Sequence, residues 1–349
     1  MSTSSSSSSS SPLPPFPSNV KTAPLVSLSL ARLQAGDEQE SAAFFASAKA
    51  LGFFYLEMGG SEVGEAMVRE ANALNDLQMQ WMALPSATKE LYGRDRGDMH
   101  DFFAYRHYVL PDGQRKEDYN IRKDDVLGLV TPRLPAHKLI LDAQPLFESY
   151  VRHCRVVIEL LLELLNHHLE LPKGTLAKLH RATERSGDHV RFNHSPPAAW
   201  DEESVRKGEH TDYGSLTILF NWLGGLQIRP PDSTEWVWVR PVPGSCIVNL
   251  GDAMVTFTAG ILRSNIHRVA PAPPPQHHLD RYSLVYFTRP EDDVVMRRLK
   301  GGIIDAQEVS PAAVNTPEMT AAEWWLKRGS GVLPGIFTAK GFESAIPAL

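Results

Sequence analysis

A histidine and an aspartate stand two positions apart in the stretch GEHTDYGSLTILF, where His210 and Asp212 precede an apolar run. Side chains two positions apart in a strand point the same way, so both could meet one cation. His267, in SNIHRVA, is a third candidate ligand. Two histidines and one carboxylate leave coordination positions open, an arrangement that suits non-haem Fe(II) handling oxygen. A strand-end cap, a turn aspartate and a core histidine are the alternative interpretation.

A second pair repeats this spacing, Arg281 and Ser283 in RYSLVYF. The segment is otherwise apolar, so an arginine there needs a buried anion rather than a surface ion pair. A guanidinium binds a carboxylate through two parallel hydrogen bonds, and a serine hydroxyl donates another. A metal site beside a carboxylate receptor is what a 2-oxo acid co-substrate needs, because its keto and C1-carboxylate oxygens would chelate iron while the arginine holds its distal carboxylate.

Short strands must position these side chains. From about residue 190 to 290 the sequence alternates apolar runs with Gly- and Pro-rich separators. Many short strands at close spacing are typical of a sandwich or barrel. The expected strands are LTILFNW, LQIRP, EWVWVRPV, SCIVNLGD, MVTFT, HRVA and RYSLVYFT.

The preceding region, residues 24–184, is predicted to be mostly helical. GDEQESAAFFASAKALG and SEVGEAMVREANALNDLQMQWMAL read as helices around a strand GFFYLEM, and QPLFESYVRHCRVVIELLLELLNHHLEL places apolar residues on one face of a long helix. DFFAYRHYVLPDGQRKEDYNIRKDD is aromatic and charged without clean periodicity. We expect it either to lie over the mouth of the barrel, with Phe102 and Tyr105 as candidates for substrate contact, or to be a solvated loop with anchoring aromatics.

Six motifs in order, HTDYGSLTIL, GLQI, WVWVRPVPG, VNLGD, SNIHRV and RYSLVYF, resemble the isopenicillin-N-synthase-like branch of the Fe(II)/2-oxoglutarate-dependent dioxygenases. PLVSLSL and ALGFFYLEMGG resemble that branch's N-terminal motifs, although the second lacks the histidine of the branch's motif. The resemblance covers roughly residues 24 to 330. It implies a mainly β fold, a double-stranded β-helix or jelly roll, flanked by N-terminal helices.

The resemblance also implies the site residues. His210, Asp212 and His267 would ligate Fe(II), and Arg281 and Ser283 would bind the distal carboxylate of 2-oxoglutarate.

Three further positions follow from the same resemblance. RFNHSPP resembles the family's NYYP-type segment, so Asn193 is expected in the co-substrate site. The tyrosine of that segment corresponds here to Ser195, which is shorter, so a water or another residue would have to make its contact. Phe287 falls where the family often packs an aromatic ring on substrate.

The implied reaction oxidises a C–H bond of a small organic molecule by hydroxylation, desaturation or ring formation, with 2-oxoglutarate and O2 as co-substrates and succinate and CO2 as products. Secondary metabolism is the expected context. One alternative uses the same iron triad without 2-oxoglutarate, as penicillin- and ethylene-forming members do, and succinate release would discriminate it. A zinc hydrolase-like use of the triad and a non-catalytic binding module are the others.

Composition indicates which kinds of partner the protein can bind and how the chain divides into regions. A net charge of −6 gives no basic footprint for nucleic acid, and no membrane-binding segment is evident. The two cysteines are expected to be reduced and buried, which favours a cytoplasmic location; the oligomeric state is not predicted. We expect a disordered Ser/Pro-rich tail at residues 1–20, a helical region at 24–184, a jelly-roll catalytic core at 190–290 and a C-terminal extension at 291–349.

Overall fold

Two facing β-sheets form the centre of the computed structural model, which describes residues 13–93, 102–110, 113–200, 207–308 and 318–329. The larger sheet has eight strands in the order β1-β2-β10-β7-β12-β5-β4-β3, and the smaller has four in the order β6-β11-β8-β9. The strands are β1 (Ser27–Ser29), β2 (Phe53–Glu57), β3 (Tyr105–Val109), β4 (Arg115–Arg122), β5 (His189–Ser195), β6 (Lys207–His210), β7 (Leu216–Asn221), β8 (Leu226–Ile228), β9 (Val237–Trp238), β10 (Ser245–Leu250), β11 (His267–Val269) and β12 (Arg281–Thr288).

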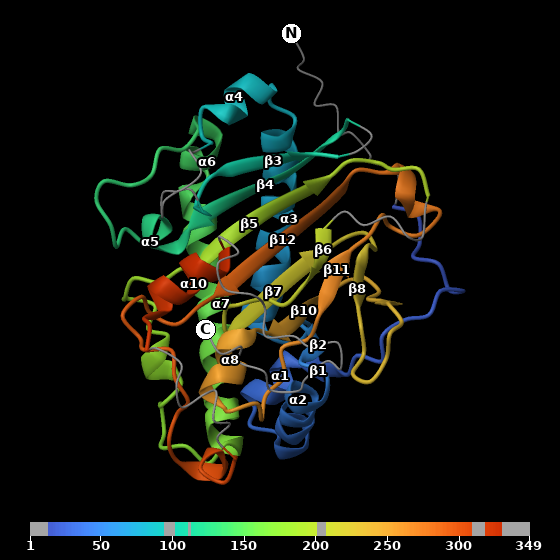
Figure 1. Cartoon of the computed structure of the whole chain (residues 1–349). Helices are drawn as coiled ribbons and strands as arrows, with labels where there is room; N and C mark the ends of the chain where they lie inside the picture. The colour runs from blue at the N-terminus through green and yellow to red at the C-terminus, as the bar shows by residue number, and fades with distance from the viewer. Residues whose placement is uncertain (1–12, 94–101, 111–112, 201–206, 309–317, 330–349) are drawn as a thin grey trace.

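Helices cover one face of the larger sheet, where α3 and α7 cross behind it in Figure 1. The predicted helices all form; α3, for example, begins where Ser61 accepts a hydrogen bond from the backbone N–H of Gly64. The helices are α1 (Leu30–Gln34), α2 (Glu38–Ala50), α3 (Glu62–Met82), α4 (Ser86–Glu90), α5 (Lys123–Val126), α6 (Lys138–Asp142), α7 (Gln144–His168), α8 (Asp252–Phe257) and α10 (Ala321–Gly329), with short 3-10 turns at Ala177–Leu179, Gln276–His278 and Gly302–Ile304.

Strands β5 and β12 pair antiparallel, and their side chains alternate between two environments. On one face Val190, Phe192, Leu284 and Tyr286 join the large apolar core formed with α3 and α7. Residues of the opposite set, such as Val285, turn toward the smaller sheet. The two-residue period of the sequence therefore separates a helix-facing side from a side that faces the second sheet.

The space between the two sheets holds a smaller apolar core. Phe53, Leu219 and Ile247 of the larger sheet pack there with Leu226 and Ile228 of the smaller sheet. The described residues 13–20 contain neither helix nor strand, although Gln276 donates to the Pro14 carbonyl at 2.8 Å. The rest of the predicted disordered tail, residues 1–12, lies outside the described residues.

One local prediction was wrong, and one segment is more regular than expected. MVTFT was expected to be a strand but belongs to helix α8, whose first residue, Asp252, follows Gly251 at the N-cap. Its β-favouring residues are overridden by packing, because Met254, Val255 and Phe257 are all buried. DFFAYRHYVLPDGQRKEDYNIRKDD, for which a solvated loop was one of two alternatives, contains the hairpin β3–β4, which extends the larger sheet beyond β5. RKEDYNIR opens with four charged residues and alternates only at Tyr119 and Ile121, so the sequence carries little strand signal for this hairpin.

Within the described ranges, no helix is both long and apolar enough to cross a membrane.

Candidate active site

His210, Asp212 and His267 lie together at the mouth of the smaller sheet, with one ligand atom of each within 4.8 Å of the others. His210 ends β6 and His267 begins β11, and the two residues are direct partners in the antiparallel ladder. Asp212 lies just beyond β6 rather than in it, so the ladder aligns the two histidines and a turn brings in the aspartate. The expected shared strand face therefore holds for the histidine pair rather than for His210 and Asp212.

Hydrogen bonds orient the donor atoms of this cluster. The Nδ1 atoms of His210 and His267 lie 2.9 Å and 3.2 Å from the carbonyls of Gly208 and Asn265, so each Nδ1–H donates to backbone. That tautomer leaves the Nε2 lone pairs toward the cluster, as metal-binding histidines require. The Nε2 atom of His267 lies 3.7 Å from Oδ1 of Asp212.

The second oxygen of Asp212 is already engaged. Thr217 Oγ1 and Asn249 Nδ2 both donate to Oδ2, each at 2.8 Å. Oδ1 is therefore the oxygen turned toward the histidines. One carboxylate oxygen and two imidazole nitrogens form a donor set that fits Fe(II) and leaves room for further ligands.

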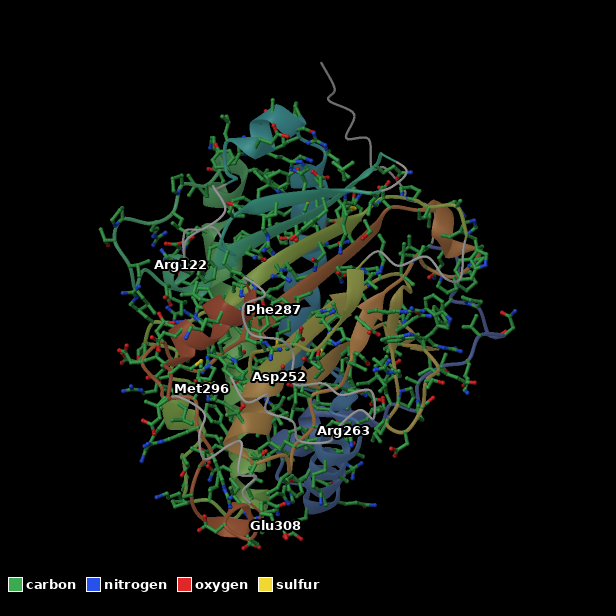
Figure 2. The ribbon with its side chains drawn as sticks, viewed as in Figure 1. Arg122, Asp252, Arg263, Phe287, Met296 and Glu308 are labelled. Atoms are coloured by element: carbon green, nitrogen blue, oxygen red, sulfur yellow. The ribbon has the colours of Figure 1, made fainter. Side chains whose placement is uncertain are left out.

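Residues of α8 and α10 stabilise the turn that carries Asp212 through hydrogen bonds and an ion pair. Asp252, labelled in Figure 2, accepts from Thr211 Oγ1 at 2.9 Å and forms a fully buried ion pair with Arg328 of α10. Its backbone N–H donates to the Asp212 carbonyl at 2.8 Å. Gly251 permits this contact, because a Cβ there would lie 2.3 Å from the Gly214 carbonyl oxygen.

A cavity of about 630 Å³, including its open mouth, extends from this cluster between the sheets. Three cationic side chains and one carboxylate contribute to its wall, so the charge of the wall favours anionic ligands. The lining residues are Phe53, Lys116, Arg191, Asn193, Ser195, His210, Asp212, Thr217, Leu219, Leu226, Asn249, His267, Val269, Arg281, Ser283, Val285 and Phe287.

Arg281 is a buried cation at one end of this cavity. Its Nε donates to the Gly224 carbonyl at 2.6 Å, and its Nη1 lies 3.5 Å from Ser283 Oγ. No carboxylate among the described residues pairs with it, and burial lowers the pKa of Arg281 to about 10. Gly225 makes room for it, because a Cβ there would lie 2.6 Å from Nε. A buried guanidinium without a carboxylate partner is able to bind an anionic ligand.

The structure brings most of the residues expected from the sequence to one cavity. Asn193 faces it and donates to Ser283 Oγ at 3.4 Å, and Ser195 is the ladder partner of Arg281. Phe287, labelled in Figure 2, also lines it, with its ring stacked on His189 at a centroid distance of 4.8 Å.

The two candidates for substrate contact, Phe102 and Tyr105, do not line the cavity. The Tyr105 side chain is buried against Trp81 on the helix-facing side of the sheet, because Tyr105 pairs with Tyr119 and both point away from the cavity. Phe102 does not line the cavity, but its ring lies 5.7 Å from the guanidinium carbon of Arg191, which does. The structure therefore does not bring Tyr105 to the cavity and leaves Phe102 behind its wall.

Sequence reasoning missed several cavity residues. Asn249 was not among the predicted site residues, yet it lies in β10 and donates a hydrogen bond to Asp212. Arg191 stands two positions before Asn193, the same spacing that drew attention to Arg281 and Ser283, so its signal was present. Thr217 and Lys116 had no comparable signal.

Comparisons with known proteins agree with this geometry. The family model described as the 2OG-Fe(II) oxygenase superfamily matches residues 186–290. A 2-oxoglutarate-dependent dioxygenase of Aspergillus fumigatus is 32% identical over 333 residues, covering 89% of this chain and 86% of that protein. A 2-oxoglutarate-dependent dioxygenase of Gibberella zeae is 28% identical, covering 89% and 88% respectively.

Solved structures show the same architecture. A putative 2OG-Fe(II) oxygenase family protein from Caulobacter crescentus superposes with a TM-score of 0.72 at 22% identity, covering 89% of this chain and 100% of that one. A full-length Neurospora crassa protein in complex with alpha-KG and 5-formyluracil gives 0.72 at 19% identity, covering 88% and 96%. The predicted jelly-roll core with flanking helices is confirmed, and its sheets do not close into a barrel.

Proposed function

We infer the reaction of this protein from the premise that the chain belongs to the 2OG-Fe(II) oxygenase superfamily. It is an enzyme of the 2-oxoglutarate-dependent dioxygenase type, with Fe(II) as its metal and 2-oxoglutarate and O2 as co-substrates. Bound Fe(II) supplies the activation of O2 that couples decarboxylation of 2-oxoglutarate, to succinate and CO2, to oxidation of a substrate C–H bond.

We propose that His210, Asp212 and His267 are the iron ligands. The observation that carries this assignment is their mutual approach within 4.8 Å, with the histidine Nδ1 atoms bonded to backbone and the second oxygen of Asp212 bonded to Thr217 and Asn249. These bonds fix the three donor atoms before metal arrives, which limits the ordering that metal binding must produce.

Arg281 and Ser283 are the proposed receptor for the distal carboxylate of 2-oxoglutarate, with Asn193 positioning the serine hydroxyl. The burial of Arg281 without a carboxylate partner in the described chain calls for an anionic ligand, and the relatives named 2-oxoglutarate-dependent dioxygenases favour 2-oxoglutarate as that ligand. Lys116 lines the same cavity and is the cation proposed to make the contact that Ser195 is too short to make.

The substrate is proposed to be a small organic molecule of secondary metabolism, oxidised at a C–H bond by hydroxylation, desaturation or ring formation. It would bind beside the metal against Phe287, within a cavity that the two sheets shield on either side. Excluding water and holding the reacting C–H bond near the metal are the tasks of this wall. A cytoplasmic location remains a prediction from the two buried free thiols, Cys154 and Cys246.

The test begins without substrate. Fe(II) is added to the metal-free protein in the absence of oxygen, and 2-oxoglutarate is titrated while the visible spectrum is recorded. A weak charge-transfer band that saturates is expected when the keto acid chelates iron. Iron binding without any band would favour the members that share the triad but not the co-substrate.

Variants then assign the ligands. His210→Ala and Asp212→Ala are each expected to abolish iron binding and to reduce succinate formation at least 100-fold. His278→Ala, at an exposed histidine, is the control and should change neither quantity. Full activity in both ligand variants would refute the triad assignment.

A further inference from the structure

A second buried arginine faces the cavity. Arg191 of β5 is 9% exposed and lines the cavity wall. Its Nε donates to Asn120 Oδ1 at 2.6 Å, which leaves both terminal nitrogens for another acceptor. The nearby carboxylate of Asp118 is paired with Arg106 at 2.8 Å, and Arg191 itself has no ion-pair partner among the residues that the structure describes.

The Asp118 carboxylate is the strongest charge acting on Arg191, but Asp118 is shared with Arg106, and further positive charge lies close by. Arg289 lies beside it, is 3% exposed, and has no hydrogen-bond partner at Nε or Nη1. Aromatic rings surround Arg289, with Phe102 at 4.5 Å and Tyr213 at 4.8 Å from its guanidinium carbon. Such cation–π contacts recover part of the cost of burying one cation, but they leave two guanidinium groups without a carboxylate partner. An anion supplied from outside would relieve this repulsion.

The strand register separates Arg191 from the co-substrate receptor. Arg191 pairs with Val285, whereas Arg281 pairs with Ser195, so the two arginines lie four ladder positions apart in one cavity. Four positions correspond to roughly 13 Å along a strand. One 2-oxoglutarate held by Arg281 at its distal end therefore leaves Arg191 for a different anionic group.

Apolar surface adjoins the guanidinium of Arg191. Its carbon lies 4.8 Å from the centroid of the Phe287 ring, and Val285, its ladder partner, also lines the cavity. A ligand that satisfies this wall combines an anionic group with an apolar or aromatic body. A guanidinium with two terminal nitrogens available matches the two oxygens of a carboxylate.

We propose that Arg191 is the substrate receptor of this enzyme and that the substrate is an organic carboxylate whose apolar body packs on Phe287 and Val285. This proposal rests on the proposed function, because it assumes that 2-oxoglutarate occupies the Arg281 end. Arg191 binds the carboxylate of the substrate, Asn120 holds the guanidinium in place, and Arg289 strengthens the positive field behind it. The enzyme would thus select small acids over their neutral analogues.

The experiment uses the anaerobic complex of the protein with Fe(II) and 2-oxoglutarate. The probes are phenylacetate and indole-3-acetate, their neutral amides, and phenyl phosphate. The readouts are the change that each probe makes in the charge-transfer band and, after oxygen is admitted, the stimulation of succinate formation. Both carboxylates are expected to act at concentrations at least 30-fold below those of the amides.

Three variants connect this preference to one residue. Arg191→Met is expected to weaken the carboxylate response at least 30-fold while leaving the 2-oxoglutarate affinity within about threefold of the wild-type value. Arg191→Lys should recover part of the response, because lysine restores the positive charge but lacks the two parallel N–H donors of a guanidinium. Arg297→Met, at an exposed arginine, is the control and should respond as the wild type does.

Several outcomes would overturn the proposal. Arg191 would be a co-substrate residue if Arg191→Met weakened 2-oxoglutarate binding itself. Equal responses to amides and acids, a stronger response to phenyl phosphate, or no response to either carboxylate would each exclude the assigned substrate class. A wild-type protein that forms no band with 2-oxoglutarate would instead refute the proposed function, and thermal unfolding of the metal-free wild type and Arg191→Met with each acid would then decide the role of Arg191 separately.

Discussion

The two sides of the larger sheet treat buried arginines in opposite ways. On the helix-facing side, Arg155 of α7 is 4% exposed and pairs with Asp188, 3.3 Å from its Nη1. On the cavity side, Arg281 is 6% exposed, and no carboxylate of the described chain pairs with it. The two side chains are almost equally buried, so burial does not explain how they differ.

Their pKa values move in opposite directions. Burial lowers the pKa of both guanidinium groups, but around Arg155 the neighbouring Tyr286 and Asp188 outweigh it and raise the pKa. Nothing opposes burial at Arg281, whose pKa falls to about 10. The fold supplies a carboxylate partner for Arg155, whereas we propose that the partner of Arg281 comes from a ligand.

The largest expected effect comes from removing the paired arginine on the helix-facing side. Arg155→Met leaves Asp188 buried without its cation, and the free energy of unfolding should fall by about 3–5 kcal/mol. Urea denaturation measures this change, while 2-oxoglutarate affinity at the remaining folded fraction should be unaffected. Unchanged stability would mean that Tyr286 and the backbone N–H of Arg289, which also donate to Asp188, suffice to hold its charge.

The corresponding substitution on the cavity side should weaken 2-oxoglutarate binding and leave the stability of the fold nearly unchanged. Arg281→Met removes a cation that no described carboxylate neutralises, so the free energy of unfolding should stay within about 1 kcal/mol or rise. Affinity for 2-oxoglutarate should fall by about 2–5 kcal/mol, roughly 30- to 4,000-fold, because the distal carboxylate loses its partner. Titration of the charge-transfer band measures this affinity, and iron binding should be retained. A fold that collapses on this substitution would show that Arg281 is structural.

Two buried asparagines test the same difference between the two sides of the sheet, with smaller expected effects. Asn249 holds Asp212 on the cavity side, whereas Asn166 of α7 binds the carbonyls of Leu171 and Pro172 away from it. Asn249→Ala should lower metal affinity about 10- to 100-fold, since outer contacts orient metal ligands. Asn166→Ala should instead cost about 1–3 kcal/mol of stability.

Iron titration and urea denaturation of both asparagine variants supply the measurements. Each variant serves as the control for the other. The contrast between the two sides of the sheet fails if Asn166→Ala lowers metal affinity as much as Asn249→Ala does.

Sequence reasoning succeeded where one strand carries the information. The two-residue period of RYSLVYFT assigned Arg281 and Ser283 to one face, and the structure places both in the cavity wall. The fold and its cofactors were predicted from six motifs in order, and the family comparisons confirm them. The roles of the individual residues remain proposals.

Contacts between distant segments could not be predicted in this way. The ion pair between Asp252 and Arg328 joins α8 to α10, and no local pattern links those two residues. The face of the sheet on which Tyr105 lies depends on its pairing with Tyr119. The sequence of this charged hairpin does not predict that strand register. The helix at MVTFT likewise depends on tertiary packing that outweighs local preference.

The smallest expected effect concerns a carboxylate on the helix-facing side. Glu117 pairs with Lys89 at 2.5 Å and contacts His194 and Tyr105. Burial would raise the pKa of Glu117, but hydrogen bonds from His194, Lys89 and Tyr105 lower it to about 2. Because the folded pKa lies below the ordinary value of 4.5, Glu117 stabilises the fold above about pH 4.5, and that contribution is lost as the pH falls toward about 2.

Glu117→Gln should therefore flatten the acid limb of the stability curve by on the order of 1–2 kcal/mol between these pH values. Urea denaturation of wild type and variant at several pH values from about 2 to 6 provides the measurement, with Glu90→Gln, at an exposed glutamate, as the control. Identical acid limbs would show that this buried carboxylate is no better neutralised in the folded state than in the unfolded chain. The partners on the helix-facing side would then stabilise buried arginines but not this buried carboxylate. The contrast with the cavity side would hold for arginine alone.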